Sequence, residues 1–167
     1  MQFRLRDFRQ EDFDTLWGID QRCFARGVAY SRPELDAYME HPGSFTLVAE
    51  AETSEGNNPG HNTLSILGFL VAHPPNRRGL GHIVTIDVLP EAQRSGVGSR
   101  LLLAAEDRLR AAQGRGVSLE TAVDNQPAIT FYKRHGYFVI KTLPRYYSNG
   151  VDAFLMRKDL HSAAQAS

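Results

Sequence analysis

The sequence predicts a mixed α/β fold, in which strands and helices alternate within one domain. Segments of strand periodicity and of helix periodicity follow one another along the chain. A glycine-containing turn joins an apolar strand directly to an amphipathic helix, and 167 residues are enough to bury one substantial core. We therefore expect a single domain over residues 1–160, followed by a flexible tail at 161–167.

The predicted elements follow the order strand, two helices, three strands, helix, strand, helix and two strands. Their expected ranges are strands at 3–8, 44–51, 64–72, 82–88, 117–122, 137–142 and 153–157, and helices at 11–24, from 31, from 97 and from 125. Ser31 predicts the start of the second helix because Glu34 completes a capping box. Residues 52–62 are rich in Gly, Asn and Pro, so we expect a mobile surface loop there.

Composition and charge argue against several functional classes. The chain has 19 basic and 19 acidic residues, so no overall field favours nucleic acid or an anionic membrane. No apolar run approaches the roughly 20 residues of a membrane span, and the N-terminal residues are charged from the start. We therefore expect a soluble, cytoplasmic protein.

Cysteine usage predicts neither a disulfide nor a metal site. Cys23 is the only cysteine, and no cluster of His and Cys has the spacing of metal ligands. Cys23 lies between apolar residues of a predicted helix, so we expect a buried, apolar-like side chain rather than a nucleophile.

The most informative segment runs from Ile86 to Ser99 and joins a strand to a helix. The first amides of a helix lack carbonyl partners and lie at the positive end of its dipole, so they attract anions. Gly96 and Gly98 let the backbone approach a bulky phosphate closely. The sequence of this segment lacks the Lys-Ser/Thr ending of a Walker loop and the third glycine of a Rossmann fingerprint. An ordinary tight strand-to-helix connection is the alternative.

A second segment, residues 119–137, predicts a strand, a short helix and a further strand. Asn125 can cap the helix, Pro127 is tolerated in its first turn, and Gly136 can end it. Read from these residues alone, Asn125 is a helix cap.

Both segments resemble signatures of the GNAT superfamily of N-acetyltransferases. The run Gln93-Arg94-Ser95-Gly96-Val97-Gly98 is similar to the family's Gln/Arg-x-x-Gly-x-Gly/Ala pyrophosphate loop. Residues 125–137 are similar to its Asn-x-x-Ala-x-x-Phe/Leu-Tyr-x-x-x-Gly-Phe motif. The resemblance covers nearly the whole chain and implies the GNAT fold, a mixed and mostly antiparallel central sheet flanked by about four helices.

The resemblance implies acetyl-CoA as co-substrate. A backbone N–H near Val88 would contact the thioester oxygen, Asn125 would hydrogen-bond the pantetheine arm, and Tyr132 would act as general acid toward the departing thiolate. A core aromatic is the alternative for Tyr132. The full set of expected cofactor contacts is Ile86, Asp87, Val88, Gln93, Arg94, Ser95, Gly96, Val97, Gly98, Ser99, Asn125, Ala128 and Tyr132.

Two residues are candidates for the base that receives the proton of the amine. Glu120 lies on the strand before the short helix, where related amino-terminal acetyltransferases carry a Glu or His that acts through water. His82 lies on the strand before the phosphate loop, where some relatives carry an aromatic or basic residue facing the acceptor. A strand-end salt bridge for Glu120 and a structural role for His82 are the alternatives.

The final hairpin suggests how an acceptor is held. Residues 143–156 are similar to the ending of ribosomal-protein alanine acetyltransferases and other protein amino-terminal acetyltransferases, in which a tyrosine pair helps to grip the peptide. Tyr146 and Tyr147 are therefore expected to bind the acceptor, with hairpin packing as the alternative, and Tyr30 is expected to line its pocket. Residues 24–31 lack the Pro-Trp pair common in the ribosomal-protein enzymes, which puts that particular substrate in doubt.

We therefore expect direct acetyl transfer, through a ternary complex, to a primary amine, with a peptide or protein α-amine as the favoured acceptor. An α-amine has a pKa of about 8 and a lysine amine of about 10.4, so the α-amine needs less help at neutral pH. A small-molecule amine, a lysine side chain and a non-catalytic acyl-CoA sensor are the alternatives. We expect a monomer or homodimer, with neither nucleic acid nor a membrane as partner.

Overall fold

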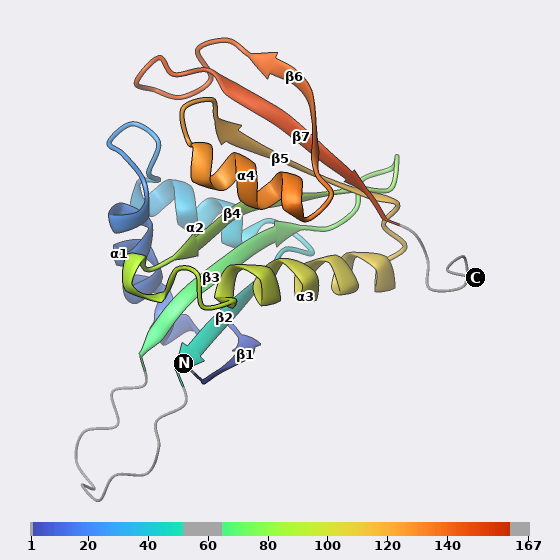
Figure 1. The fold of residues 1–167 in the computed structure, drawn as a ribbon. Helices are drawn as coiled ribbons and strands as arrows, with labels where there is room; N and C mark the ends of the chain where they lie inside the picture. The colour runs from blue at the N-terminus through green and yellow to red at the C-terminus, as the bar shows by residue number, and fades with distance from the viewer. Residues whose placement is uncertain (1, 52–64, 161–167) are drawn as a thin grey trace, which may run out of the picture.

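The computed structural model describes residues 2–51 and 65–160. The expected surface loop at 52–62 and the expected tail at 161–167 lie outside the described residues. The described chain forms a seven-stranded sheet with the order β1-β2-β3-β4-β5-β7-β6 (Figure 1). Its strands are β1 Phe3–Asp7, β2 Phe45–Ala51, β3 Ile66–His73, β4 Leu80–Val88, β5 Gly116–Ala122, β6 Phe138–Leu143 and β7 Ala153–Asp159.

Every neighbouring pair in this sheet is antiparallel except β4 and β5, which are parallel. The predicted mixed, mostly antiparallel sheet is therefore confirmed. All of the predicted strands are present, and their ends differ only slightly from the expected ranges. None of the described helices is long and apolar enough to cross a membrane.

Four helices cover the two faces of the sheet: α1 Phe13–Cys23, α2 Arg32–Glu40, α3 Val97–Ala111 and α4 Gln126–Arg134. Helices α1 and α2 pack on one face, where Leu16 and Leu35 meet Phe69 of β3. Helices α3 and α4 lie on the opposite face (Figure 1), where Leu102 belongs to the same apolar cluster as Leu70. Adjacent residues of β3 thus serve opposite cores, as the alternation of side chains along a strand requires.

The helix starts follow the capping residues in the sequence. Ser31 Oγ accepts a hydrogen bond from Glu34 N at 3.2 Å, and Ser31 N donates to Glu34 Oε1 at 3.1 Å, which confirms the predicted capping box. Short 3₁₀ turns at Gln10–Asp12 and Pro90–Ala92 were not predicted. Because of the first of these turns, α1 begins at Phe13 and not at the expected residue 11. In this turn the Asp12 side chain accepts a hydrogen bond from Arg9 N at 2.8 Å.

Strands β4 and β5 separate soon after they begin. Their pairing covers only Leu80 to His82 on β4 and Gly116 to Ser118 on β5. The register between β3 and β4 also shifts at Val84, which the pairing from Thr85 to Ile83 skips. Such a bulge bends a strand away from its neighbour. Beyond His82 the two strands therefore leave an opening in the middle of the sheet.

Candidate active site

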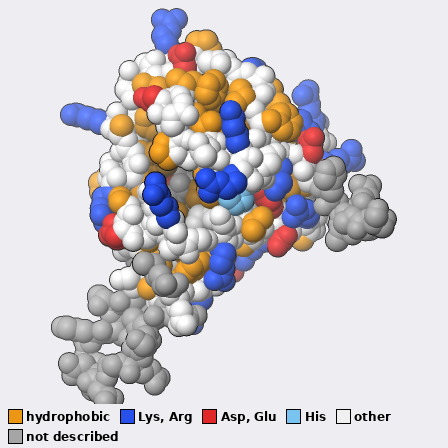
Figure 2. All heavy atoms as spheres, in the orientation of Figure 1, with side chains coloured by type: hydrophobic (Ala, Val, Ile, Leu, Met, Phe, Trp, Pro, Cys, Tyr) orange, Lys and Arg blue, Asp and Glu red, His pale blue; other side chains and the backbone are white. Residues whose placement is uncertain are grey.

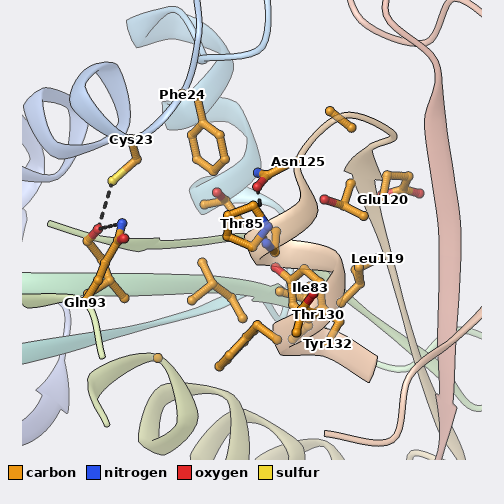
Figure 3. Close-up of a pocket in the computed structure, with 18 of the residues that line it drawn as sticks. Cys23, Phe24, Ile83, Thr85, Gln93, Leu119, Glu120, Asn125, Thr130 and Tyr132 are labelled. Atoms are coloured by element: carbon orange, nitrogen blue, oxygen red, sulfur yellow. Dashed lines mark hydrogen bonds between the residues drawn. The ribbon is translucent and has the colours of Figure 1, made fainter. Parts of the chain in front are cut away.

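A pocket of about 1030 Å³ lies at the opening between β4 and β5. Its walls include Thr85 and Val88 from β4 and Leu119 and Glu120 from β5, and α4 contributes Tyr132. Figure 3 shows Thr85, Leu119, Glu120 and Tyr132 around one space, with Cys23 and Phe24 at the end of α1 on its other side. Because the strands are unpaired here, backbone groups and side chains of both face the same space.

One end of the pocket is built from the glycine-containing turn and the start of α3. Arg94 and Gly96 have positive φ values of 64° and 88°, and α3 begins at the next residue, Val97. A Cβ on Gly96 would meet no atom within 4 Å, so this glycine serves backbone conformation and leaves the space beside it open. The first amides of α3 thus begin at an open, electropositive end of the pocket.

Two basic side chains belong to the pocket lining. Arg94 of the turn and Arg134 at the end of α4 both line the pocket. Lys and Arg side chains are also numerous on the face of the molecule that carries α3 and α4 (Figure 2). Arg134 was not among the residues predicted from the sequence, although its place at the end of a predicted helix facing the turn was a usable signal. The arrangement suits a ligand with several phosphate groups.

The backbone of Val88 faces the open edge of β4. Leu89 N donates to Leu67 O on β3 at 2.9 Å, and successive peptide groups of a strand point in opposite directions. The N–H and C=O of Val88 therefore point away from β3. Gln93 Nε2 and Cys23 Sγ donate to Val88 O at 3.1 and 3.3 Å, which occupies the carbonyl of Val88 at this edge (Figure 3). The N–H of Val88, in the preceding peptide group, points to the same edge and is placed to stabilise a developing negative charge.

Tyr132 and Asn125 both line the pocket from the second predicted segment. Asn125 Oδ1 accepts a hydrogen bond from Ala128 N at 3.2 Å, so its predicted role as helix cap is confirmed. Tyr132 is 8% exposed. Burial is the main cause that raises the pKa of Tyr132, followed by the nearby Asp87 and Tyr147. The phenol is therefore protonated at neutral pH and has a proton to donate.

The two candidate bases form one hydrogen-bonded pair. His82 Nε2 lies 2.7 Å from Glu120 Oε2, and both side chains are partly buried. Glu120 lines the pocket, whereas His82 does not. The sequence offered the two residues as alternatives, and the geometry places Glu120 in the pocket wall with His82 as its hydrogen-bond partner.

The other end of the pocket is lined by aromatic side chains from two loops. Tyr30 precedes α2 and its hydroxyl donates to Val84 O, at the bulge of β4, at 3.3 Å. Tyr147 follows β6, and Tyr146 packs edge-on against it with ring centroids 5.0 Å apart. Burial raises the pKa of Tyr30 and the pKa of Tyr147, and it raises the pKa of Tyr146 to about 12. All three rings are therefore neutral.

These two loops also bind each other. Ser148 Oγ donates to Gly27 O at 2.9 Å, and Asn149 Nδ2 donates to Arg26 O at 3.5 Å. Gly27 has a φ of 91°, and a Cβ on it would lie 2.8 Å from Asn149 Cβ. We call this contact between residues 26–27 and 148–149 the clasp. It joins the loop that carries Tyr30 to the loop that carries Tyr147.

A comparison with known families agrees with this geometry. The family model described as "Acetyltransferase (GNAT) family" matches residues 7–137. The chain belongs to this family. It is an acetyl-CoA-dependent N-acetyltransferase.

Relatives and solved structures support the same family. An "N-alpha-acetyltransferase" from Sulfolobus acidocaldarius is 40% identical over 164 residues, which cover 95% of this chain and 93% of the relative. The structure of Ard1 from Thermoplasma volcanium is 26% identical, with a TM-score of 0.82 over 97% of this chain and 100% of that one. The ribosomal-protein-S18-alanine N-acetyltransferase from Escherichia coli shares the fold at 20% identity, with a TM-score of 0.75 over 99% of each chain.

Acetyl-CoA fits the pocket of this N-acetyltransferase by its chemistry. The α3 amides and arginines suit a pyrophosphate, and the free N–H of Val88 suits a thioester oxygen. Most of the expected contacts line the pocket, namely Ile86, Val88, Gln93, Arg94, Gly96, Gly98, Ser99, Asn125, Ala128 and Tyr132. No group of three or more His, Cys, Asp or Glu side chains able to hold a metal occurs within residues 2–51 and 65–160.

Some residues expected at the site lie outside the pocket lining of the acetyltransferase. Ser95 donates its hydroxyl to Ala92 O, and Val97 is buried in the core beneath α3. Tyr146 is 49% exposed and reaches the pocket only through Tyr147. Asp87 is fully buried and is not among the residues that line the pocket.

The sequence predicted a buried side chain for Cys23, and this was wrong in part. The side chain is partly rather than fully buried, and it lines the pocket. Burial is the first cause that raises the pKa of Cys23 to about 12, followed by Asp87 and Asp20. The thiol is therefore neutral, as expected of a residue that is not a nucleophile. The sequence also missed Phe24, Val28 and Thr85, whose positions in the pocket depend on the bulge and on the loop before α2.

Proposed function

We propose that this N-acetyltransferase acetylates the α-amine at the N-terminus of a peptide or protein. One observation carries the proposal: the Val88 amide, Tyr132 and Glu120 meet in a pocket whose far end is narrowed by Tyr30 and Tyr147 and held by the clasp. The name of the Sulfolobus acidocaldarius relative supports this acceptor. Family membership favours an enzyme over the non-catalytic acyl-CoA sensor.

The proposed reaction is a direct transfer. The nitrogen of the neutral amine attacks the thioester carbonyl carbon, and Val88 N–H stabilises the negative oxygen of the tetrahedral intermediate. The carbon–sulfur bond then breaks, and the Tyr132 hydroxyl protonates the departing sulfur. Glu120 receives the proton of the amine, directly or through a water molecule, while His82 orients the carboxylate.

The acidity of the acceptor favours an α-amine over a lysine side chain. With a pKa of about 8, a tenth or so of an α-amine is already neutral at pH 7, whereas a lysine amine with a pKa of about 10.4 is almost fully charged. For an α-amine, a single carboxylate paired to a histidine suffices as the group that receives the proton. The cytoplasmic location expected from the sequence stays a prediction.

The test uses two peptides of the same sequence, each with one internal lysine. One peptide has a free N-terminus, and its matched control is blocked there. After incubation with acetyl-CoA, fragment-ion mass spectrometry locates the added acetyl group. We expect acetylation only of the free α-amine, and Glu120→Gln lowers kcat/KM by about 100-fold near neutral pH, with partial recovery as the pH rises and the amine loses its proton unaided.

Two results would contradict the proposal. Acetylation of the lysine in the blocked peptide, at the rate seen with the free peptide, would indicate a side-chain acceptor. No transfer to either peptide, with transfer to small amines, would indicate a small-molecule acceptor.

A further inference from the structure

Two buried carboxyl groups of α1 and β4 lie within hydrogen-bond reach of each other. Asp20 of α1 and Asp87 of β4 are both 0% exposed. The other buried acids of the described chain lie against basic side chains: Asp12 against Arg6, Glu50 against Arg4 and Arg6, and Glu106 against Lys158. Within residues 2–51 and 65–160, neither Asp20 nor Asp87 forms an ion pair with a basic group.

The hydrogen bonds of the two groups leave one oxygen on each without a donor. Asp20 Oδ2 accepts from Tyr30 N at 2.7 Å and from Gln21 Nε2 at 3.4 Å, and Asp87 Oδ1 accepts from Thr85 Oγ1 at 2.5 Å. The remaining oxygens, Asp20 Oδ1 and Asp87 Oδ2, are buried without a hydrogen-bond partner in the described chain. Two ionised carboxylates in this position would repel each other, and a single proton between them satisfies both oxygens.

The surroundings place that proton on Asp87. Asp20 already accepts from two N–H groups, which favours its ionised form, whereas Asp87 accepts only from a neutral hydroxyl. Burial, followed by the charge of Asp20, raises the pKa of Asp87 well above its usual range. Burial also raises the pKa of Asp20, while its hydrogen bond with Asp87 lowers it.

We propose that Asp87 donates a shared proton to Asp20, and that this carboxyl–carboxylate bridge positions the acceptor end of the pocket against the strand that holds the thioester. The inference rests on the proposed function and adds positioning residues to it. Asp20 holds the backbone of Tyr30, whose ring lines the acceptor end and whose hydroxyl bonds to β4. Asp87 directly precedes Val88, the residue with the free N–H.

Few groups near the bridge can gain or lose protons. The titratable groups that face it are Glu34 on α2 and Tyr30 before α2, both near Asp20, Cys23 on α1, near both carboxyls, and Tyr132 on α4, near Asp87. Burial raises the pKa of Cys23 to about 12 and raises that of Tyr132, so both are neutral and neither competes for the proton. On β3, the residue paired with Asp87 is Phe69, which is apolar.

The test compares two substitutions at the same position. Asp87→Asn keeps a donor for Asp20 Oδ1 and an acceptor for Thr85, whereas Asp87→Leu has a similar volume and neither group. We expect Asp87→Asn to keep most of the activity. Asp87→Leu should raise KM for the peptide about tenfold, while the Kd of acetyl-CoA, measured calorimetrically without peptide, changes by less than about twofold.

Infrared spectroscopy of the free enzyme tests the proton itself. We expect the wild-type protein at neutral pH to show the carbonyl stretch of one protonated carboxylic acid, which Asp87→Asn removes. This readout and the Kd of acetyl-CoA do not depend on the acceptor, so they remain informative if the proposed peptide substrate is wrong.

Three results would overturn the inference. The first is the absence of a protonated-acid band that Asp87→Asn removes. The second is an equal rise of peptide KM in Asp87→Asn and Asp87→Leu. The third is a rise in the Kd of acetyl-CoA as large as the rise in peptide KM, which would indicate a general loss of structure. If Asp87→Leu fails to fold, the infrared comparison of wild type with Asp87→Asn still decides.

Discussion

At Tyr132, burial opposes the proton transfer that the proposed mechanism requires. Burial raises the pKa of the phenol, whereas a thiol has a pKa of about 8.5 in water, so transfer from phenol to thiolate is uphill. The same pocket also destabilises a thiolate, which raises the pKa of the departing thiol. The proton is therefore best transferred as the carbon–sulfur bond breaks, before a full charge forms on sulfur.

Substitution Tyr132→Phe tests this step. It removes the hydroxyl and keeps the ring that packs against Phe131 and Tyr137. We expect kcat to fall by about 100-fold or more, because general acid catalysis contributes roughly that factor. The Kd of acetyl-CoA, measured calorimetrically, should stay within about twofold of the wild-type value.

The matched control is Tyr137→Phe, on the next buried tyrosine. Its hydroxyl donates to Glu106 Oε2 at 2.9 Å, away from the pocket. We expect this variant to lose about 1–3 kcal/mol of unfolding free energy and to keep its kcat. A similar kcat for Tyr132→Phe and wild type would show that another group protonates the sulfur.

At the scale of single elements, the start of α3 predicts opposite effects on stability and on cofactor affinity. Gly98 lies in the first turn of α3 and lines the pocket. Gly98→Asp adds a carboxylate at the positive end of the helix, so the unfolding free energy should rise by about 0.3–1 kcal/mol. The same charge repels a phosphate ligand, so the Kd of acetyl-CoA should rise about 10- to 100-fold. Chemical denaturation and calorimetry measure the two effects separately.

Gly98→Ala separates charge from volume in this test. A Cβ on Gly98 would lie 3.4 Å from the Phe131 ring, which is ordinary contact. We expect Gly98→Ala to bind acetyl-CoA within a few-fold of wild type, on the order of threefold. An unchanged Kd for Gly98→Asp would mean that the phosphates bind elsewhere and that the turn is only a tight connection.

The clasp gives a second prediction at this scale. Gly27→Ala would bring a Cβ to 2.8 Å from Asn149 Cβ and 3.0 Å from Asn149 N, so the two loops must move apart. Because these loops carry Tyr30 and Tyr147, we expect KM for the peptide to rise about tenfold with little change in the Kd of acetyl-CoA. Steady-state kinetics with the peptide varied provides the measurement.

Gly150→Ala is the control for backbone strain. Gly150 lies in the same loop with a φ of 84°, but a Cβ there would meet no atom within 4 Å. Both variants carry the cost of a left-handed alanine, about 1–2 kcal/mol, and only Gly27→Ala also disturbs the clasp. Equal peptide KM values in the two variants would mean that the clasp does not set the width of the pocket.

At the scale of the whole molecule, the sequence predicts what depends on local order. Ser31 and Asn125 act as caps because the groups they bind lie within one helical turn. The turn before α3 is recognisable because its glycines and the flanking apolar periodicity are contiguous in the chain. The order of strands and helices follows from the same local patterns, which is why the element order was confirmed.

Pairings between distant segments could not be predicted in this way. His82 and Glu120 were alternatives in the sequence because only the parallel start of β4 and β5 brings them together. The sequence predicted Asp87 as a cofactor contact, yet the alternation of side chains along β4 directs it into the core toward Asp20. No local signal tells which acid of a strand meets another acid of a helix.

Few backbone hydrogen bonds join the two halves of the sheet, because β4 and β5 pair only over their first residues. Contacts outside the sheet must therefore help to hold the β5-β7-β6 half against the rest. One of them is buried: Lys158 Nζ of β7 bonds to Glu106 Oε1 of α3 at 2.7 Å, and Glu106 is 0% exposed. Tyr137 donates to the other oxygen of the same carboxylate. These contacts join α3 to the far half of the sheet.

This arrangement predicts a large cost for Lys158→Met. The substitution keeps an apolar stem but leaves Glu106 charged and buried, which costs about 3–5 kcal/mol of unfolding free energy. Arg157→Met on the same strand is the control, because its pair with Asp159 is largely exposed, and we expect it to cost less than about 1 kcal/mol. In Lys158→Met/Glu106→Gln the buried charge is gone while an acceptor for Tyr137 remains, so most of the loss should be recovered. Urea denaturation of the wild type, the two single variants and the double variant measures these values. A cost for Lys158→Met no larger than that for Arg157→Met would mean that the far half of the sheet is held by its apolar contacts alone.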